Sequence, residues 1–117
     1  LLHDATEAFI GDMVRPLKQL SAMIDYRDIE HGIWLAICKR FDLDHYLPAS
    51  VKEADMIALA TERRELLPDH PGAWECLAGV QPLPHHLPRW TPEQAREHYH
   101  DRLISLLATT HRRRHAA

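Results

Sequence analysis

Signals that start helices recur along this sequence, and they limit what the chain can fold into more than any other feature. The tetrapeptides Ser50-Val51-Lys52-Glu53 and Thr91-Pro92-Glu93-Gln94 are capping boxes, in which two side chains bond the first free N–H groups of a helix. They predict helices over 50–67 and 91–110, and Asp25 is expected to cap a third. No segment shows the period-two alternation of a strand. The sequence therefore predicts an all-α fold of about five helices.

Apolar spacing predicts which faces of these helices are buried. In the helix that starts at Asp25 the expected buried residues are Ile29, Ile33, Trp34, Ile37 and Phe41. In the last helix they are Ala95, Tyr99, Leu103, Leu106 and Leu107. Residues 68–90 are rich in proline, and we expect a long irregular connection there with one helical turn near Trp74.

Length and composition restrict the function classes. With 117 residues, a single domain over 1–117 is the default. The formal net charge of −3 gives no basic field for a nucleic-acid polymer, and no apolar run approaches the ~20 residues of a membrane span. Cys38 and Cys76 follow no metal-binding spacing, and we expect reduced thiols in a cytoplasmic protein. Because the chain opens on Leu1-Leu2 without Met, we expect N-terminal helices of the domain to lie upstream of it.

The first eighteen residues bring several ionisable groups together. His3 and Asp4 are adjacent, and Glu7 lies on the same face of the helix end that we expect over 1–10. Gly11 is a natural stop for that helix, because glycine adopts left-handed conformations without penalty, and Asp12 then lies on the exit turn near Glu7. An imidazole among like-charged carboxylates is unstable without a cation, so this cluster predicts a metal site.

Two further residues have both a functional and a structural interpretation. Asp55 lies in the apolar stripe of the helix over 50–67, which is apolar on most sides and is expected to be central in the fold. A carboxylate there is costly unless it binds a cation or pairs with a donor such as Arg63. Lys18 either holds a phosphate or is a solvated lysine on a short helix. By contrast, His100-Asp101 has no carboxylate at the matching offset, and we expect this pair to be exposed and without a role.

These motifs resemble those of the HD-domain metal-dependent phosphohydrolases, in particular the branch that contains the bacterial 5′-deoxynucleotidase. The resemblance covers roughly residues 1–67 and rests on His3-Asp4-Ala5-Thr6-Glu7, Gly11-Asp12, Pro16-x-Lys18 and Val51-Lys52-Glu53-Ala54-Asp55. It implies a helical bundle that holds a divalent metal through the pattern His … His-Asp … Asp. His3 and Asp4 match the central pair and Asp55 the last ligand. The first histidine of the pattern would lie upstream of Leu1.

The resemblance also implies an activity. The metal would be Mn, Co, Fe or Zn, with Mg as a further candidate, and the substrate a deoxynucleotide mono- or triphosphate. Glu7 would orient or deprotonate the attacking water, Asp12 would help to position it, and Lys18 would neutralise the phosphate. Related enzymes commonly form homodimers. Two alternatives stay open: hydrolysis of another nucleotide class, and a non-catalytic helical interaction domain with a degenerate metal site.

Overall fold

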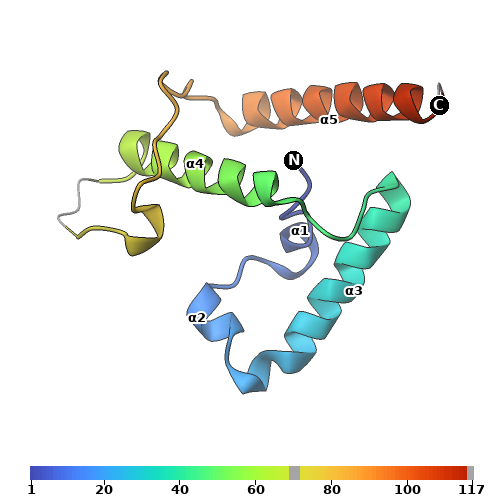
Figure 1. Cartoon of the computed structure of the whole chain (residues 1–117), viewed down its shortest axis with the longest axis horizontal. Coiled ribbons are helices and arrows are strands. Elements are labelled where there is room, and N and C mark those ends of the chain that lie inside the picture. The colour runs from blue at the N-terminus through green and yellow to red at the C-terminus, as the bar shows by residue number, and fades with distance from the viewer. Residues whose placement is uncertain (69–71, 116–117) are drawn as a thin grey trace. The chain divides into compact units, whose positions relative to one another are not determined.

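The computed structural model describes residues 1–68 and 72–115, with side chains up to residue 109. Within these residues the chain forms five α-helices and two 3₁₀ helices and no strand, so the predicted all-α class is confirmed (Figure 1). None of the described helices is both long and apolar enough to cross a membrane. The chain divides into two compact units, Leu1–Leu47 with Leu103–Ala117, and Pro48–Arg102. Each unit is described by itself.

The first unit opens with turns where the sequence predicted a helix over 1–10. The N–H of Ala5 donates to the carbonyl of Leu2 at 3.1 Å, and the N–H of Glu7 donates to the carbonyl of Asp4 at 3.0 Å. These bonds span three residues, so they form successive turns rather than an α-helix. Helix α1 begins only at Glu7 and comprises Glu7–Ile10. The predicted helix over 1–10 is therefore wrong except for its last four residues.

Gly11 ends α1, as predicted. Its N–H donates to the carbonyl of Glu7, and its φ of 76° and ψ of 163° lie in a region that only glycine enters readily. Helix α2 (Arg15–Lys18) follows with Pro16 in its first turn, where the missing N–H has no helical partner to lose. The 3₁₀ helix η1 (Ser21–Met23) then leads into the long helix of the unit.

Helix α3 comprises Ile24–Phe41. The predicted cap is wrong, because Asp25 lies inside the first turn and Met23 precedes the helix without a side-chain cap. The predicted buried face is correct at Ile37, which is 8% exposed, and wrong at Ile29, which is 57% exposed. Asp42 closes α3 in the left-handed conformation. Within α3, burial is thus confined to Ile37 and Cys38 near its carboxyl end.

Helix α4 (Ala49–Glu65) belongs to the second unit and begins one residue before the predicted Ser50 cap. Pro48 is extended and precedes the helix, so the hydroxyl of Ser50 lies within the first turn and the predicted capping box does not form. The expectation of an apolar helix buried on most sides is also wrong. Within α4 only Ala60 and Thr61 are buried, and Ala58 is exposed.

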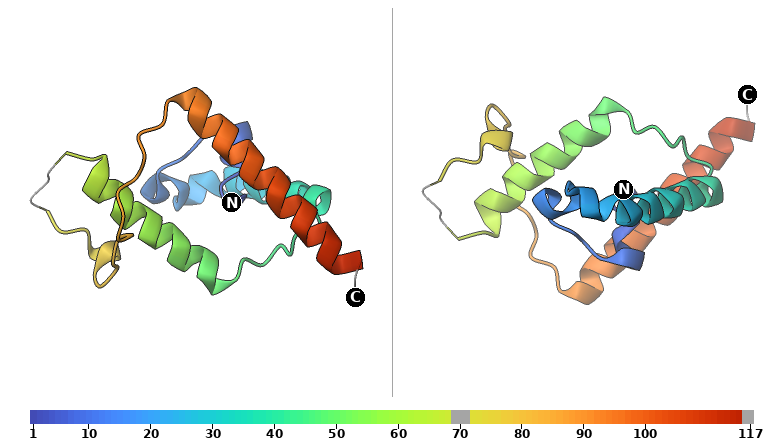
Figure 2. Two further views of the ribbon diagram at one scale, coloured as in Figure 1. Left: turned by 90° about the horizontal axis from the view of Figure 1, so that it is seen from above. Right: turned by 90° about the horizontal axis from the view of Figure 1, so that it is seen from below.

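The predicted irregular connection over 68–90 is confirmed for its described part, and residues 69–71 lie outside the described residues. It contains a single 3₁₀ turn, η2 (Glu75–Leu77), next to Trp74 as expected. In both views of Figure 2 the part after η2 crosses α4 near the carboxyl end of that helix. Two hydrogen bonds tie them together: Arg64 of α4 donates to the carbonyls of Leu83 at 2.7 Å and His85 at 2.9 Å.

Helix α5 (Pro92–His115) starts with the predicted capping box. The N–H of Gln94 donates to the hydroxyl of Thr91 at 3.3 Å, and the side chain of Gln94 accepts the N–H of Thr91 at 2.9 Å. The helix extends past the predicted end at 110. Its expected buried stripe is wrong, since Ala95, Tyr99 and Leu106 are exposed, and Leu103 and Leu107 are only half-buried.

Candidate functional site

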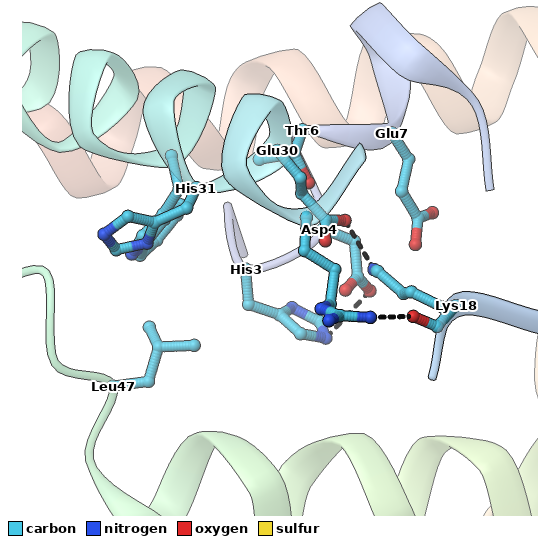
Figure 3. Close-up of a pocket in the computed structure, with 10 residues that line it drawn as sticks. His3, Asp4, Thr6, Glu7, Lys18, Glu30, His31 and Leu47 are labelled. Atoms are coloured by element: carbon cyan, nitrogen blue, oxygen red, sulfur yellow. Dashed lines mark hydrogen bonds and ion pairs between the residues drawn. The ribbon is translucent and has the colours of Figure 1, made fainter. Parts of the chain in front are cut away.

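A pocket of about 310 Å³ lies in the first unit, between the N-terminal turns, α2, α3 and Leu47. Four of the six residues that the sequence analysis assigned to a site line it (Figure 3): His3, Asp4, Glu7 and Lys18. They come from two turns and the ends of two four-residue helices, which the segment from Gly11 to Val14 joins. The other two assigned residues are Asp12 and Asp55.

His3 and Asp4 form an adjacent imidazole–carboxylate pair. The Nε2 atom of His3 lies 2.8 Å from Oδ2 of Asp4, and the two side chains are 30% and 59% exposed. When the imidazole carries a proton on this nitrogen, the two side chains form an ion pair. Because both atoms are also the preferred donors of first-row divalent metals, a metal ion would compete with that proton for the pair.

Glu7 is the first residue of α1 and is half-buried. Burial raises the pKa of its carboxyl group above the ordinary value of 4.5, and the negative charges of Asp4 and Asp12 raise this pKa further. The ammonium of Lys18 acts in the opposite direction but does not cancel these effects. A carboxylate with a raised pKa is a stronger base than usual, which is the property required for removing a proton from water near neutral pH.

Lys18 is not freely solvated, which was the structural interpretation of this residue. Its ammonium lies 2.5 Å from Oε1 of Glu30, and the side chains of the pair are 29% and 19% exposed. Asp12, in contrast, is exposed and is not among the residues that line the pocket. It is still close enough to Glu7 for its charge to act on the pKa of that carboxyl group.

Asp55 lies on α4, in the second unit. Its carboxylate accepts a hydrogen bond from Lys52, one turn earlier, at 2.7 Å, and its side chain is 36% exposed. The structural alternative was a pair with a donor such as Arg63, and the donor seen here is Lys52. Arg63 instead donates to the carbonyl of Gly72 at 2.7 Å and lies 4.9 Å from the ring centroid of Trp74. Whether Asp55 is a metal ligand stays a prediction.

Helix α3 provides one wall of the pocket, and none of the residues of this wall was predicted to belong to a site. Arg27, Glu30, His31 and Trp34 line it, and their spacing of three, one and three residues places them on one helical face. Trp34 was predicted in an apolar stripe, and the polar residues beside it were not predicted as site residues. This spacing is the signal that could have found them. The pair His100-Asp101 is exposed, as predicted, with its ring nitrogen 3.7 Å from the carboxylate.

Comparisons with known proteins give one relative and no family. No family model and no solved structure matches the chain. The chain is similar to a protein of Escherichia coli K12 described as uncharacterized protein YfdR, with 42% identity over 80 residues. This match covers 68% of the chain and 44% of YfdR, so the chain spans less than half the length of this curated relative.

Proposed function

We propose that this chain carries the catalytic site of an HD-type metal-dependent phosphohydrolase acting on nucleotides, with deoxynucleotide mono- or triphosphates as the preferred class. One observation above all supports the proposal. His3, Asp4, Glu7 and Lys18, which the resemblance connects only through their order in the sequence, line the same pocket. Its volume of about 310 Å³ falls at the low end of the ~300–1,000 Å³ typical of small-molecule sites, which suits a mononucleotide better than a polymer.

The donor set fits a divalent cation. His3 and Asp4 offer a nitrogen and an oxygen 2.8 Å apart, and by resemblance Asp55 would add a second carboxylate. The negative charges of Asp4 and Asp12 both act on Glu7, and a cation would relieve this repulsion. When bound, the metal would polarise a phosphate oxygen and make a water molecule more acidic.

Three side chains of the protein have the other roles in the proposed reaction. Glu7 accepts the proton of the attacking water, and its raised pKa suits that role. Lys18, held in the wall of the pocket, neutralises a phosphate oxygen. Asp12 acts from outside the pocket, both through its charge on Glu7 and, by resemblance, by helping to position the water.

The test is release of inorganic phosphate, or of a longer phosphate chain, from a panel of deoxy- and ribonucleotide mono- and triphosphates. Metal-stripped protein receives Mn, Co, Fe, Zn or Mg in turn, and metal binding is measured separately by calorimetry. Asp4→Asn and Asp55→Asn should each weaken metal binding and abolish turnover. Asp101→Asn is the matched control, because it changes the same residue type in the chain's second His-Asp pair, which is exposed.

Turnover that is independent of added metal, or an Asp4→Asn protein that binds metal like the wild type, would refute the proposal. If Asp4→Asn loses turnover and Asp55→Asn retains it, the site does not include Asp55. The substrate that turns over fastest identifies the nucleotide class, so cyclic and other nucleotides belong in the same panel.

One observation favours a second candidate, a helical interaction domain without catalysis. Large apolar side chains of the first unit are exposed, including Phe9 at 70%, Val14 at 67% and Tyr46 at 76%. Exposed apolar area of this kind is typical of surfaces that bind another protein. Absence of metal binding together with self-association, measured by analytical ultracentrifugation, would support this candidate.

A further inference from the structure

One face of α3 holds the segment that carries Lys18. The hydroxyl of Tyr26 donates to the carbonyl of Gly11 at 3.1 Å. Arg27 donates from Nη1 to two carbonyls at the end of α2, those of Lys18 at 2.7 Å and Leu20 at 3.0 Å. Glu30, one turn further along α3, accepts from the ammonium of Lys18. Four hydrogen bonds made by three residues of a single helix therefore position the return of the chain after Gly11.

Lys18 is held at both of its ends. Arg27 holds its main-chain carbonyl, and Glu30 holds its ammonium. The ring of Tyr26 adds a third contact, since the Nζ atom of Lys18 lies 5.8 Å from the ring centroid. A solvated lysine has free rotation about four side-chain bonds, whereas a lysine held at both ends has little of this freedom left to lose when an anion binds.

We propose that Arg27 and Glu30 are positioning residues that hold Lys18 in the pocket wall as a preformed site for a phosphate group. The inference rests on the proposed function for the identity of the phosphate, which would belong to a nucleotide. An ammonium has three N–H donors, so the contact with Glu30 leaves Lys18 the capacity to donate to a phosphate oxygen as well. Glu30 acts on the phosphate through Lys18 in this arrangement, and its negative charge also raises the pKa of the Glu7 carboxyl group.

The experiment measures how fast the side-chain amine of Lys18 is acylated by an amine-reactive ester under limiting reagent. Lysine occurs at positions 18, 39 and 52 only, so peptide mass spectrometry can follow each site separately. Lys39 is exposed on α3 and serves as the internal reference. The variants are Glu30→Gln, and as matched control Asp28→Asn, which removes the same charge from an exposed position of the same helix.

Glu30→Gln should raise the rate at Lys18 relative to Lys39 by about fivefold, the size that a part-buried ion pair can supply, and Asp28→Asn should leave the ratio unchanged. Arg27→Lys keeps the charge but removes the guanidinium whose Nη1 atom donates to both carbonyls. It should therefore raise the ratio as well. Inorganic phosphate should protect Lys18 in the wild type, and a higher phosphate concentration should be needed in Glu30→Gln. In turnover, the same variant should raise KM more than it lowers kcat.

An unchanged ratio at Lys18 in a folded Glu30→Gln protein would overturn the positioning role. Absence of phosphate protection in the wild type would overturn the phosphate site. Circular dichroism checks the fold, and if Glu30→Gln does not fold, Glu30→Asp replaces it, with a smaller rise expected from the shorter side chain. Labelling requires no turnover, so a protein that hydrolyses no nucleotide would refute the proposed function while the positioning of Lys18 is still decided.

Discussion

The pocket of the first unit and the loop attachment of the second unit use charged side chains in different ways. Around the pocket, charged groups pair with one another: His3 with Asp4, and Lys18 with Glu30. Glu7 lies among these groups and carries a raised pKa because it is buried and near other acids. Such groups keep the capacity to exchange a partner for a ligand, since ion pairs between side chains are individually weak.

Beside α4, Arg63 and Arg64 donate to main-chain carbonyls, and Arg64 also pairs with the Glu65 carboxylate. Arg64 donates to the carbonyls of Leu83 and His85, and Arg63 donates to that of Gly72. Thr61, which is fully buried, donates to the carbonyl of Ile57 at 2.6 Å and accepts the N–H of Leu83 at 3.0 Å. The segment is irregular, so its main-chain N–H and C=O groups have no partners within a helix. These bonds supply the partners. These hydrogen bonds attach the irregular segment to α4.

The largest effect is expected at Glu7. Glu7→Gln should reduce metal-dependent phosphate release by ~10²–10⁴-fold, because the amide cannot accept a proton from water. Stability should respond in the opposite direction. With its pKa raised above 4.5 in the folded state, the Glu7 carboxyl stabilises the fold below that value and loses this contribution as pH rises through the folded pKa. The variant should therefore be at least as stable as the wild type at pH 8.

Phosphate release and thermal unfolding at pH 4 and pH 8 check this prediction. Asp101→Asn serves as the control for loss of an exposed acid. A Glu7→Gln protein with wild-type turnover, or one that is clearly less stable at pH 8, would contradict the role assigned to Glu7.

The second effect concerns the loop attachment. Thr61→Val keeps the side-chain shape but removes the acceptor of the Leu83 N–H, so it should cost ~1–3 kcal/mol of unfolding free energy. Thr109→Val is a matched control, because the hydroxyl of Thr109 makes the same bond to the residue four positions earlier and is exposed. Urea unfolding measures both variants. Equal losses in the two variants would mean that the bond to Leu83 contributes nothing.

Two glycine substitutions should change the free energy of unfolding by smaller amounts and in opposite directions. Gly11→Ala should cost about 1–2 kcal/mol, because its φ of 76° is strained for any residue with a Cβ atom, although no atom lies within 4 Å of the added carbon. Gly32→Ala should gain roughly 0.5–1 kcal/mol, since Gly32 lies inside α3 and its added Cβ also meets open space. Chemical denaturation of the two variants should therefore shift in opposite directions. A destabilised Gly32→Ala protein would indicate a contact on that face of α3.

The smallest effect is expected at Glu65. Hydrogen bonds from His86 and Arg64 hold the pKa of the Glu65 carboxyl below its usual 4.5. Its stabilising contribution is present above that value and is lost as pH falls through the folded pKa. Glu65→Gln should lower the melting temperature slightly at pH 7 and converge with the wild type in acid. Glu62→Gln, at an exposed position, is the control. If the melting temperature of Glu65→Gln differs from that of the wild type by the same amount at every pH, the Glu65 carboxylate does not make this contribution.

Local signals predicted the elements better than the burial. The capping box at Thr91, the stop at Gly11 and the turn near Trp74 depend on neighbouring residues, and all three form as predicted. The box at Ser50 fails because Pro48 already sets the start of α4 one residue earlier. Buried faces were predicted poorly: Ile29 and Tyr99 are exposed, because an apolar residue is buried only where another element covers it.

The sequence by itself determined the all-α class and the group of ionisable residues from His3 to Lys18, since helix caps, glycine stops and residue spacing act over a few positions. Only the tertiary structure decided which of these residues share a pocket and which side chains of other elements contact them. Glu30 and Arg27 lie on a different helix, and their contacts with Lys18 depend on how the chain returns after Gly11. Spacing along the chain carries no information on that return, because it is determined by main-chain hydrogen bonds and ion pairs between separate elements.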